Sequence, residues 1–363
     1  MRGLNYLAVT IKDIARLAGV SANTVSRALN DKGEISPKTK QRVLRIAREQ
    51  GYSKNSLAAS LATSRTSTVG LITPDICDPF YAEQARGVEE AAKAKGYTMI
   101  LIDFDEDPEA ELSAVNTCRS KRVDGIILTS VFARVDHIEG LEKQGVPLVL
   151  LNRWLPSMET DFVINDNFNG AYRATRHLID LGHKHIAHIT GPLTITSVRE
   201  RYLGYCKALE EAGLSVYPSL VSQGESLKPE AGEEAARQVL AGKPRPTAVF
   251  AYCDTLAIGV MSMARKMGLM IPEEMAVVGY DDIPLAAYLG VPLTTIAQPA
   301  RDMGKLACQI LIEKIEREGD EQGRPWPRRQ VKTLASLVVR SSCGAPGPIA
   351  GSQPQNSAVL RGV

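Results

Sequence analysis

The segment from Ala22 to Leu29 carries side chains that could read the bases of DNA. At helical spacing, Val25 and Ala28 fall on one side of it, and the opposite side presents Ala22, Asn23, Ser26 and Arg27. An asparagine amide can pair with adenine through two hydrogen bonds, and an arginine guanidinium can pair with guanine in the same way. These residue types at this spacing indicate a helix that inserts into a major groove.

A second set of chemically capable side chains follows the apolar runs between residues 69 and 280. Aromatic rings, carboxylates and arginines at one rim suit a polyhydroxylated ligand, because rings stack on its flat face and charged groups bind its hydroxyls. Aspartate and asparagine also cap helices, and this simpler explanation stays open for about half of the positions. The set consists of Asp75, Asp78, Phe80, Tyr81, Asn152, Arg153, Asn165, Asp166, Ser197, Arg201, Cys253, Asp254 and Asp281.

Three histidines, His183, His185 and His188, raise the question of metal binding. No carboxylate or thiol lies at a fixed spacing from them, and an imidazole site needs converging ligands. The six cysteines form no C-x-x-C pair, and the chain lacks G-x-G-x-x-G, G-K-[ST] and G-x-S-x-G motifs. We therefore predict no metal, no cofactor and no enzymatic activity.

Charge divides the chain into a basic head and an acidic body. Residues 1–65 contain twelve lysines and arginines and four acids, a net charge of +8, whereas the whole chain carries +2. A small basic module favours a polyanion, since counterions are released on association. A basic surface kept for solubility is the alternative, so the helical pattern must decide.

Three short helices are predicted in this head. Thr10 and Asp13 fit a capping box at the start of the first helix, which ends before Gly19. Ser21 is a good N-cap for the second helix, and a third is expected over residues 36–51. Three helices in this order, within the basic segment, are typical of a helix-turn-helix module.

A possible hinge connects the head to the body. Asn55 can cap one or two helical turns that place Leu57 and Leu61 on one side, and a polar linker follows. An isolated helix of this length is marginal in water, so we expect it to form only against DNA or a partner chain.

The head resembles that of the lactose/galactose repressor family of bacterial transcription regulators. The resemblance is carried by VTIKDIARLAGVSANTVSRALN (residues 9–30), Gly51-Tyr52, Asn55 and Leu61, and it extends to about Arg340. It implies that Leu61 wedges into the minor groove and kinks the operator. It also implies base contacts by Ala22, Asn23 and Arg27, and phosphate contacts by Thr10, Ser21, Thr24 and Asn30.

One position departs from the family pattern in the hinge. Lys54 stands where the family usually has a proline before the hinge asparagine. Loss of the proline reduces preorganisation of the backbone, while the lysine adds a possible phosphate contact. We still expect the hinge helix to form.

The body alternates apolar runs with helical patterns, which predicts parallel sheets covered by helices. We expect strands over residues 69–73, 98–104, 125–129, 148–152, 162–165, 186–190, 248–251 and 276–280, and helices over 81–95, 169–181, 200–212, 228–240 and 254–267. Eight strands over this length suit two sheets better than one, and two facing sheets form a cleft beyond their strand ends. Arg199 and Glu200 are predicted to be a solvated helix start.

The same resemblance implies the organisation of the whole chain. The fold class is a small all-α helix-turn-helix head plus an α/β body of two similar doubly wound parallel-sheet subdomains, periplasmic-binding-protein-like, with three crossovers near Asn165, Thr294 and Pro325. The expected parts are a DNA-binding domain (1–52), hinge helix and linker (53–66), effector-binding and dimerisation domain (67–340) and disordered tail (341–363). Within the effector-binding domain, the N-subdomain covers about 67–165 and 296–325, and the C-subdomain about 166–294 and 327–340.

Specific ligand contacts also follow from the resemblance. It implies effector contacts by Phe80, Tyr81, Asp166, Ser197, Arg201, Cys253 and Asp281. Cys253 stands where a sugar-responsive member often has asparagine, and Leu227 stands where an aromatic residue is common. Both departures argue against a standard hexose.

The expected function is sequence-specific transcriptional regulation, as a repressor whose operator affinity responds to a sugar or sugar derivative. Dimerisation through the body would place two heads on a pseudo-palindromic double-stranded operator. The N-terminus has no signal peptide and no run of eighteen apolar residues occurs, which predicts a cytoplasmic protein without a membrane partner. A solute-binding protein of an importer shares the cleft, but it would need a secretion signal and no basic head. A cleft enzyme would need a phosphate loop or an activated nucleophile.

Overall fold

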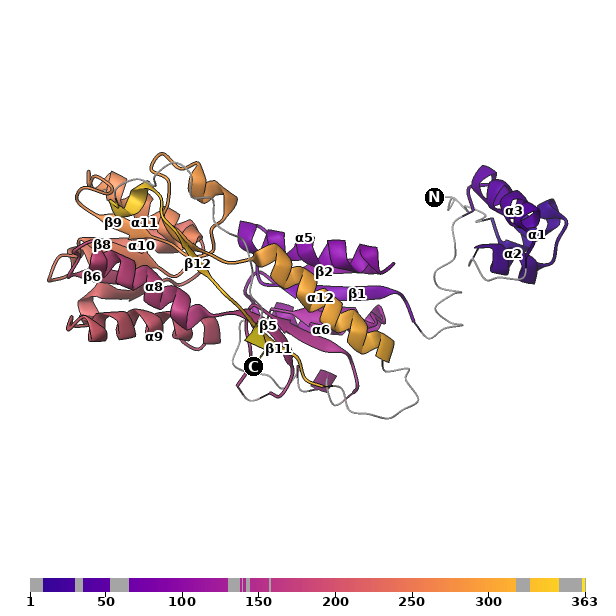
Figure 1. Cartoon of the computed structure of the whole chain (residues 1–363), viewed down its shortest axis with the longest axis horizontal. Coiled ribbons are helices and arrows are strands. Elements are labelled where there is room, and N and C mark those ends of the chain that lie inside the picture. The colour runs from indigo at the N-terminus through magenta and orange to yellow at the C-terminus, as the bar shows by residue number, and fades with distance from the viewer. Residues whose placement is uncertain are drawn as a thin grey trace, which may run out of the picture. The chain divides into compact units, whose positions relative to one another are not determined.

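The structure is a computed structural model that describes residues 9–29, 35–52, 65–129, 138, 140–141, 144–156, 158–317, 327–345 and 361–362. The chain forms two compact units, Met1–Thr66 and Ser67–Val363 (Figure 1).

Three helices form the described part of the first unit: α1 (Ile11–Ala18), α2 (Ala22–Leu29) and α3 (Pro37–Glu49). The predicted capping box begins α1, because Asp13 N–H donates to Thr10 Oγ1 at 3.3 Å and Thr10 N–H donates to Asp13 Oδ2 at 3.1 Å. Gly19 ends α1 with a φ of 62°, which glycine adopts without strain. The chain therefore turns sharply between α1 and α2, as a helix-turn-helix requires.

One apolar core joins these helices. Ile14, Val25 and Val43, one from each helix, have no exposed surface. Burial of each such side chain contributes about 1.5–3 kcal/mol, so the relative positions of the three helices are fixed mainly by these contacts.

The second unit contains two lobes, each built around a parallel sheet. The sheet of the first lobe has the order β13-β11-β5-β4-β3-β1-β2, in which β13 alone is antiparallel to its neighbour. Its strands are β1 (Thr68–Thr73), β2 (Thr98–Asp103), β3 (Gly125–Leu128), β4 (Leu148–Leu151), β5 (Asp161–Asn165), β11 (Gln330–Thr333) and β13 (Arg361–Gly362).

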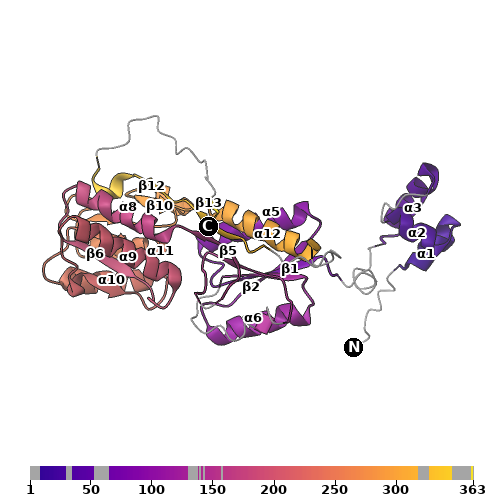
Figure 2. The ribbon, with the colours of Figure 1, turned by 60° about the horizontal axis from the view of Figure 1, so that its bottom comes forward.

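Helices cover both faces of this sheet. α5 (Pro79–Ala94) and α12 (Ala300–Arg317) lie together on one face, and α6 (Pro108–Ser120) lies on the other (Figure 2). Side chains alternate along β1, so Val69 and Leu71 pack with the α5 and α12 side, and Ile72 packs with the α6 side.

The second lobe repeats this plan with the strand order β7-β6-β8-β9. Its strands are β6 (Ile186–Thr190), β7 (Val221–Gln223), β8 (Ala248–Ala251) and β9 (Ala276–Val278). α8 (Asn167–Asp180) pairs with α9 (Thr196–Glu211), and α10 (Pro229–Ala241) pairs with α11 (Asp254–Lys266). The two pairs cover opposite faces, since alternate residues of β8 belong to different clusters. The predicted fold class of a helical head and two parallel-sheet subdomains is confirmed.

Two of the three crossovers lie later in the chain than the sequence predicted. β10 (Thr295–Ala297) pairs antiparallel with β12 (Ser336–Val338), so the second crossover follows Ala297. β11 pairs in parallel with β5, which places residues 330–333 in the first lobe and moves the third crossover from Pro325 to residues 334–335. These strands are short and partly polar, so no apolar run marks them in the sequence.

The predicted start of the disordered tail at Ser341 is wrong. Ser341–Cys343 form the 3₁₀ helix η3, in which Ser342 and Cys343 are buried. Ser342 Oγ donates to Val277 O at 2.6 Å and accepts from Thr294 N–H at 2.8 Å. The serine thus ties β9 to the residue before β10, and residues 341–345 belong to the described part of the body.

Candidate nucleic-acid interface and ligand cleft

The outer side of α2 carries the three residues predicted to contact bases. Ala22, Asn23 and Arg27 are exposed, whereas Val25 and Ala28 are buried against α1 and α3. The amide and the guanidinium therefore lie on the outer side of α2, where a recognition helix carries its base-contacting residues. Their contacts with bases stay a prediction.

The hydroxyls predicted to contact phosphates cap the helices. Ser21 Oγ accepts from Thr24 N–H at 3.1 Å and lies 2.9 Å from Thr24 Oγ1. Thr10 Oγ1 donates to Asp13 Oδ2 at 2.7 Å, and this hydrogen bond lowers the pKa of Asp13. Helix N-termini favour anions through their N–H groups and dipole, so these positions are compatible with the predicted phosphate contacts.

Exposed cations lie on the same unit. Lys12, Lys38, Arg42 and Arg48 are exposed on α1 and α3. The other DNA-directed predictions concern Asn30, Lys54, Asn55 and Leu61, which lie outside the described residues.

Five of the seven predicted effector-contacting residues line one small cavity between the lobes. Phe80 and Tyr81 come from the start of α5, and Arg201, Cys253 and Asp281 come from the second lobe. The remaining walls are Asp78, Asn152, Leu227 and Tyr252. The cavity has a volume of about 10 Å³, so the two lobes are closed on each other at this point.

The other two predicted residues stand apart from the cavity wall. Ser197 is buried, and its Oγ lies 3.2 Å from Tyr252 Oη, so it supports a wall residue. Asp166 caps α8 by accepting from Asn169 N–H at 3.2 Å and Asn169 Nδ2 at 2.7 Å. Helix capping accounts for Asp166 here, and its effector contact stays a prediction.

Arg201 is the centre of the polar network. Its Nε donates to Asn167 Oδ1 at 3.0 Å, and its Nη1 donates to Tyr252 O at 2.7 Å. The guanidinium carbon lies 3.6 Å from the ring centroid of Tyr280 and 4.4 Å from that of Tyr252. Burial alone would lower the pKa of Arg201, but the neighbouring tyrosines and Asp281 raise it, so the charge is retained.

Asp281, which is 8% exposed, faces this guanidinium. Its Oδ1 lies 3.5 Å from Arg201 Nη1 and accepts from Gln298 Nε2 at 2.5 Å. Burial raises the pKa of Asp281 to about 7, and the attraction of Arg201 limits the rise. A buried charge pair of this kind can bind a polar ligand through charge-assisted hydrogen bonds.

Hydrogen bonds between the lobes hold the cleft closed. Trp154 Nε1, from the first lobe, donates to Glu200 Oε1 at 3.1 Å, and Thr196 Oγ1 donates to Trp154 O at 2.9 Å. Lys228 Nζ pairs with Asp105 Oδ1 at 3.2 Å on the exposed rim. The prediction of a solvated helix start is therefore wrong for Glu200, which is half-buried because it meets the tryptophan of the other lobe.

The sequence reasoning missed Tyr252, Gln298 and Trp154. Tyr252 ends the apolar run of β8 and reads as a core residue, although its carbonyl and ring both contact Arg201. Gln298 stands at a crossover, where no periodic pattern predicts its direction. An aromatic residue directly after the last apolar residue of a strand was the available signal for Tyr252.

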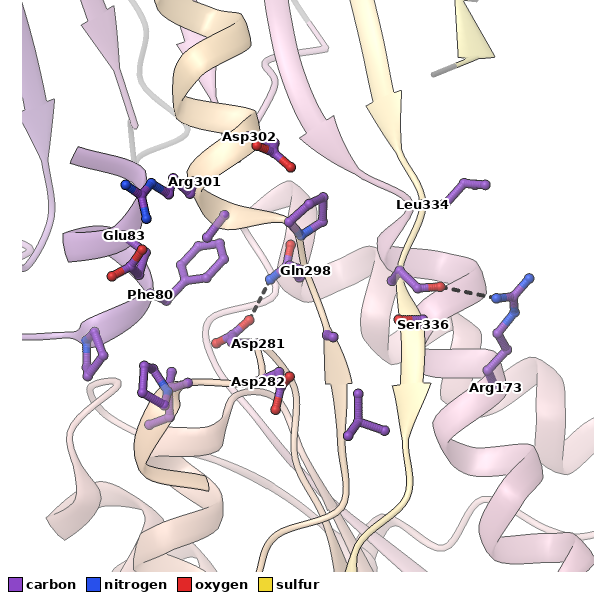
Figure 3. A pocket seen from close by; sticks show the side chains of 18 residues that line it. Phe80, Glu83, Arg173, Asp281, Asp282, Gln298, Arg301, Asp302, Leu334 and Ser336 are labelled. Carbon is purple, nitrogen blue, oxygen red and sulfur yellow. Dashed lines mark hydrogen bonds between the residues drawn. The ribbon is translucent and has the colours of Figure 1, made fainter. Parts of the chain in front are cut away.

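A larger cavity of about 600 Å³ lies beside the closed one (Figure 3). Phe80 and Asp281 line both cavities, and Gln298 lines the larger one. The crossover residues Leu334 and Ser336 form another part of its wall. The lobes and their crossovers thus form the walls of this larger cavity. It lies on the side of Asp281 that accepts the hydrogen bond from Gln298.

The three histidines occupy separate environments. His188 has no exposed surface, its Nδ1 lies 2.9 Å from Phe250 O, and burial lowers its pKa to about 4. His183 Nδ1 lies 2.9 Å from Thr247 Oγ1. Within the described ranges, no three histidine, cysteine or carboxylate side chains are grouped so that they could hold a metal ion. No helix among those residues has the length and apolar character needed to cross a membrane.

Comparison with known proteins gives two family matches. Residues 10–55 match bacterial regulatory proteins of the lacI family, and residues 66–327 match periplasmic binding proteins and the sugar binding domain of the LacI family. The chain is 38% identical over 337 residues to the HTH-type transcriptional regulator DegA of Bacillus subtilis, covering 92% of this chain and 97% of that one.

Two solved structures are similar over nearly their whole length. The lac repressor dimer bound to operator and the anti-inducer ONPF has a TM-score of 0.81 and 26% identity, covering 93% of this chain and 99% of that one. The complex of the transcriptional regulator CelR with cellobiose has a TM-score of 0.70 and 32% identity, covering 92% and 99%.

Proposed function

The chain belongs to the LacI family of bacterial regulatory proteins, and we propose that it is a repressor whose operator affinity is set by a carbohydrate-like molecule in the interlobe cleft. It is a DNA-binding transcription regulator, not an enzyme. In the proposal, Ala22, Asn23 and Arg27 read bases, and Arg201 and Asp281 bind the effector. The protein acts in the cytoplasm, where its operator is.

The buried pair of Arg201 and Asp281 carries the effector assignment. Both side chains are less than a tenth exposed and line a space between two lobes. Removing two charges from water costs several kcal/mol, and it is tolerated where additional hydrogen bonds are made. Asn152, 2% exposed on the same wall, supports the assignment because its Oδ1 accepts no hydrogen bond from the described residues.

Opening and closing of the cleft is the change by which a ligand alters operator affinity. A small ligand needs a pocket of roughly 300 Å³ or more, and the cavity of about 10 Å³ admits none. Ligand entry into this small cavity must therefore separate Phe80 and Tyr81 from Cys253 and Asp281. A ligand that binds one lobe arrangement better shifts the population toward it, and this changes how the heads are presented to DNA.

The chemistry of the walls favours a ligand with several hydroxyls and a flat face. Tyr81 and Tyr252 supply rings, while Arg201, Asn152 and Asp281 supply donors and acceptors. The thiol of Cys253 is neutral, because burial raises its pKa well above the ordinary value. It adds an apolar contact where an amide would bind another hydroxyl, so the preferred ligand carries fewer hydroxyls at that position.

A thermal-shift screen of the full-length protein tests the effector assignment. The panel is cellobiose, D-ribose, a hexose phosphate, D-gluconate and guanine, measured on the wild type and on Asp281→Ala. At a concentration of 100 Kd a ligand stabilises by about 2.7 kcal/mol, which is a clear shift. The proposal requires that at least one of the four carbohydrate compounds stabilises the wild type and alters operator binding, and that Asp281→Ala loses both effects. A response to guanine alone contradicts the carbohydrate assignment. A compound that stabilises the wild type and Asp281→Ala equally would show that its binding site does not depend on Asp281.

A further inference from the structure

Asp254 is the first residue of α11 and has no exposed surface. An acid at this position ordinarily serves its own helix through the helix dipole. Here the carboxylate also binds two other segments. Its Oδ2 accepts from Ile283 N–H at 2.9 Å, and its Oδ1 accepts from Thr295 Oγ1 at 2.6 Å. The side chain therefore ties α11 both to the loop after β9 and to β10.

The loop that Asp254 binds is the one that carries Asp281. Asp254 N–H donates to Tyr280 O at 2.7 Å, so Asp254 holds the loop directly before Asp281 and, through Ile283, two residues after it. Between these attachments Asp281 and Asp282 have φ values of 112° and 55°. Such conformations are strained for non-glycine residues and persist only where the surroundings hold them.

Arg201 spans the same two segments. Its Nη1 donates to Tyr252 O on the α11 side and lies 3.5 Å from Asp281 Oδ1 on the loop side. The packing around Asp254 is tight, since a Cβ at Gly279 would lie 2.1 Å from Asp254 Oδ1. Arg201 Nη1 thus lies between Tyr252 O and Asp281 Oδ1. The distance between these two oxygens is set where Asp254 joins α11 to the loop.

We propose that Asp254 is a positioning residue of the ligand cleft, which holds the strained loop of residues 280–283 so that Asp281 meets Arg201 and the effector. The role in ligand binding rests on the proposed function of the cleft, whereas the restraint on the loop exists without ligand. Asparagine is the conservative replacement, because it keeps the shape and one acceptor oxygen, and its amide can donate to Thr295 Oγ1.

Hydrogen exchange of the full-length protein without ligand tests the restraint. In Asp254→Leu we expect the amides of residues 281–283 to exchange about 10- to 100-fold faster than in the wild type, because two buried hydrogen bonds are lost. Asp254→Asn should stay within about threefold of the wild type. Thr295→Val keeps the shape and removes the Oδ1 partner, but it also removes the acceptor of Asp282 N–H at 3.4 Å. Its exchange is therefore compared at the Ile283 amide, where we expect an intermediate rate, so the test does not depend on the leucine variant folding.

Ser342→Ala is the matched control. Ser342 is also fully buried and bridges Val277 and Thr294, but its hydrogen-bond partners among the described residues lie outside residues 280–283. In Ser342→Ala, the amides of that loop should exchange at the wild-type rate. Wild-type exchange in both Asp254→Leu and Thr295→Val, or equal acceleration in Ser342→Ala, overturns the proposal.

The second measurement separates positioning from general stability. With the compound from the panel above that shifts the wild type most, Thr295→Val and Asp254→Leu should bind at least about tenfold more weakly, while operator affinity without ligand stays unchanged. Asp254→Asn should restore binding. Accelerated exchange with unaltered ligand affinity overturns the positioning role. If no compound of the panel binds the wild type, the proposed function fails, and exchange still decides whether Asp254 restrains the loop.

Discussion

Arg27 and the lysines of the head should contribute to DNA binding in different ways. An arginine that pairs with guanine discriminates by about 1–3 kcal/mol per base, whereas a lysine that neutralises a phosphate acts on every sequence. Arg27→Ala should therefore weaken binding to the operator about 5- to 150-fold and barely affect a scrambled duplex. Lys12→Ala, the charge-matched control on α1, should weaken both alike and reduce the salt slope by about one. Fluorescence anisotropy on the two duplexes measures this, and equal losses for Arg27→Ala would refute base reading.

Asp281 should make stability depend on pH. Burial raises its pKa from 3.8 to about 7, so the folded protein keeps a proton that the unfolded chain releases between these values. This contribution to the free energy of unfolding is fully present below about pH 4 and is lost as the pH rises through 7. Relative to Asp281→Asn, which does not titrate, the wild type should lose up to about 4 kcal/mol between pH 4 and 8. Urea unfolding of both proteins across this range measures the difference, and a difference that does not change with pH would contradict the prediction.

At the scale of elements, the contact between Trp154 and the start of α9 should control how often the cleft opens. Trp154→Phe keeps an aromatic ring but removes the Nε1 donor to Glu200. Loss of one hydrogen bond of about 1 kcal/mol should raise the open population about fivefold. Cys253 is 2% exposed and lines the cleft, so the labelling rate of its thiol with a maleimide, followed by peptide mass spectrometry, reports opening. Lys207→Ala removes ion pairs within α9 and should label at the wild-type rate. Equal labelling of wild type and Trp154→Phe would exclude this latch.

The elements that were predicted from the sequence differ from those that were not in how their residues are buried. β6 and β8 are buried on both faces and appear as continuous apolar runs, so their positions were predictable. β11 is polar and half-buried at Gln330 and Lys332, and its place in the sheet depends on pairing with β5, which is distant in sequence. The cleft follows the same rule. Arg201 and Asp281 stand out by residue type, whereas Glu200 and Tyr252 gain their roles from the other segments they meet. Such long-range contacts leave no local period in the sequence.

At the scale of the whole molecule, the second lobe exposes an apolar face. A groove of about 410 Å³ is lined by Ile258, Met261, Leu269, Ile271 and Leu289, and Tyr288 beside it is 84% exposed. Contiguous apolar patches on soluble proteins mark contact sites. We expect this face to contribute to the homodimer that the sequence predicts.

Charges introduced on this face should separate the protomers. Burying an unpaired carboxylate in an apolar interface costs several kcal/mol, so Met261→Glu and Tyr288→Asp should each shift dimer to monomer in sedimentation velocity. Operator affinity should fall steeply, because one head binds one half-site and the gain from linking two heads is lost. Ligand-induced thermal shifts should persist, since the cleft lies within one chain. Leu203→Glu is the matched control, because Leu203 is an apolar residue that is 48% exposed on α9, away from the groove. A Leu203→Glu monomer, or dimers of both Met261→Glu and Tyr288→Asp, would place the interface on another surface.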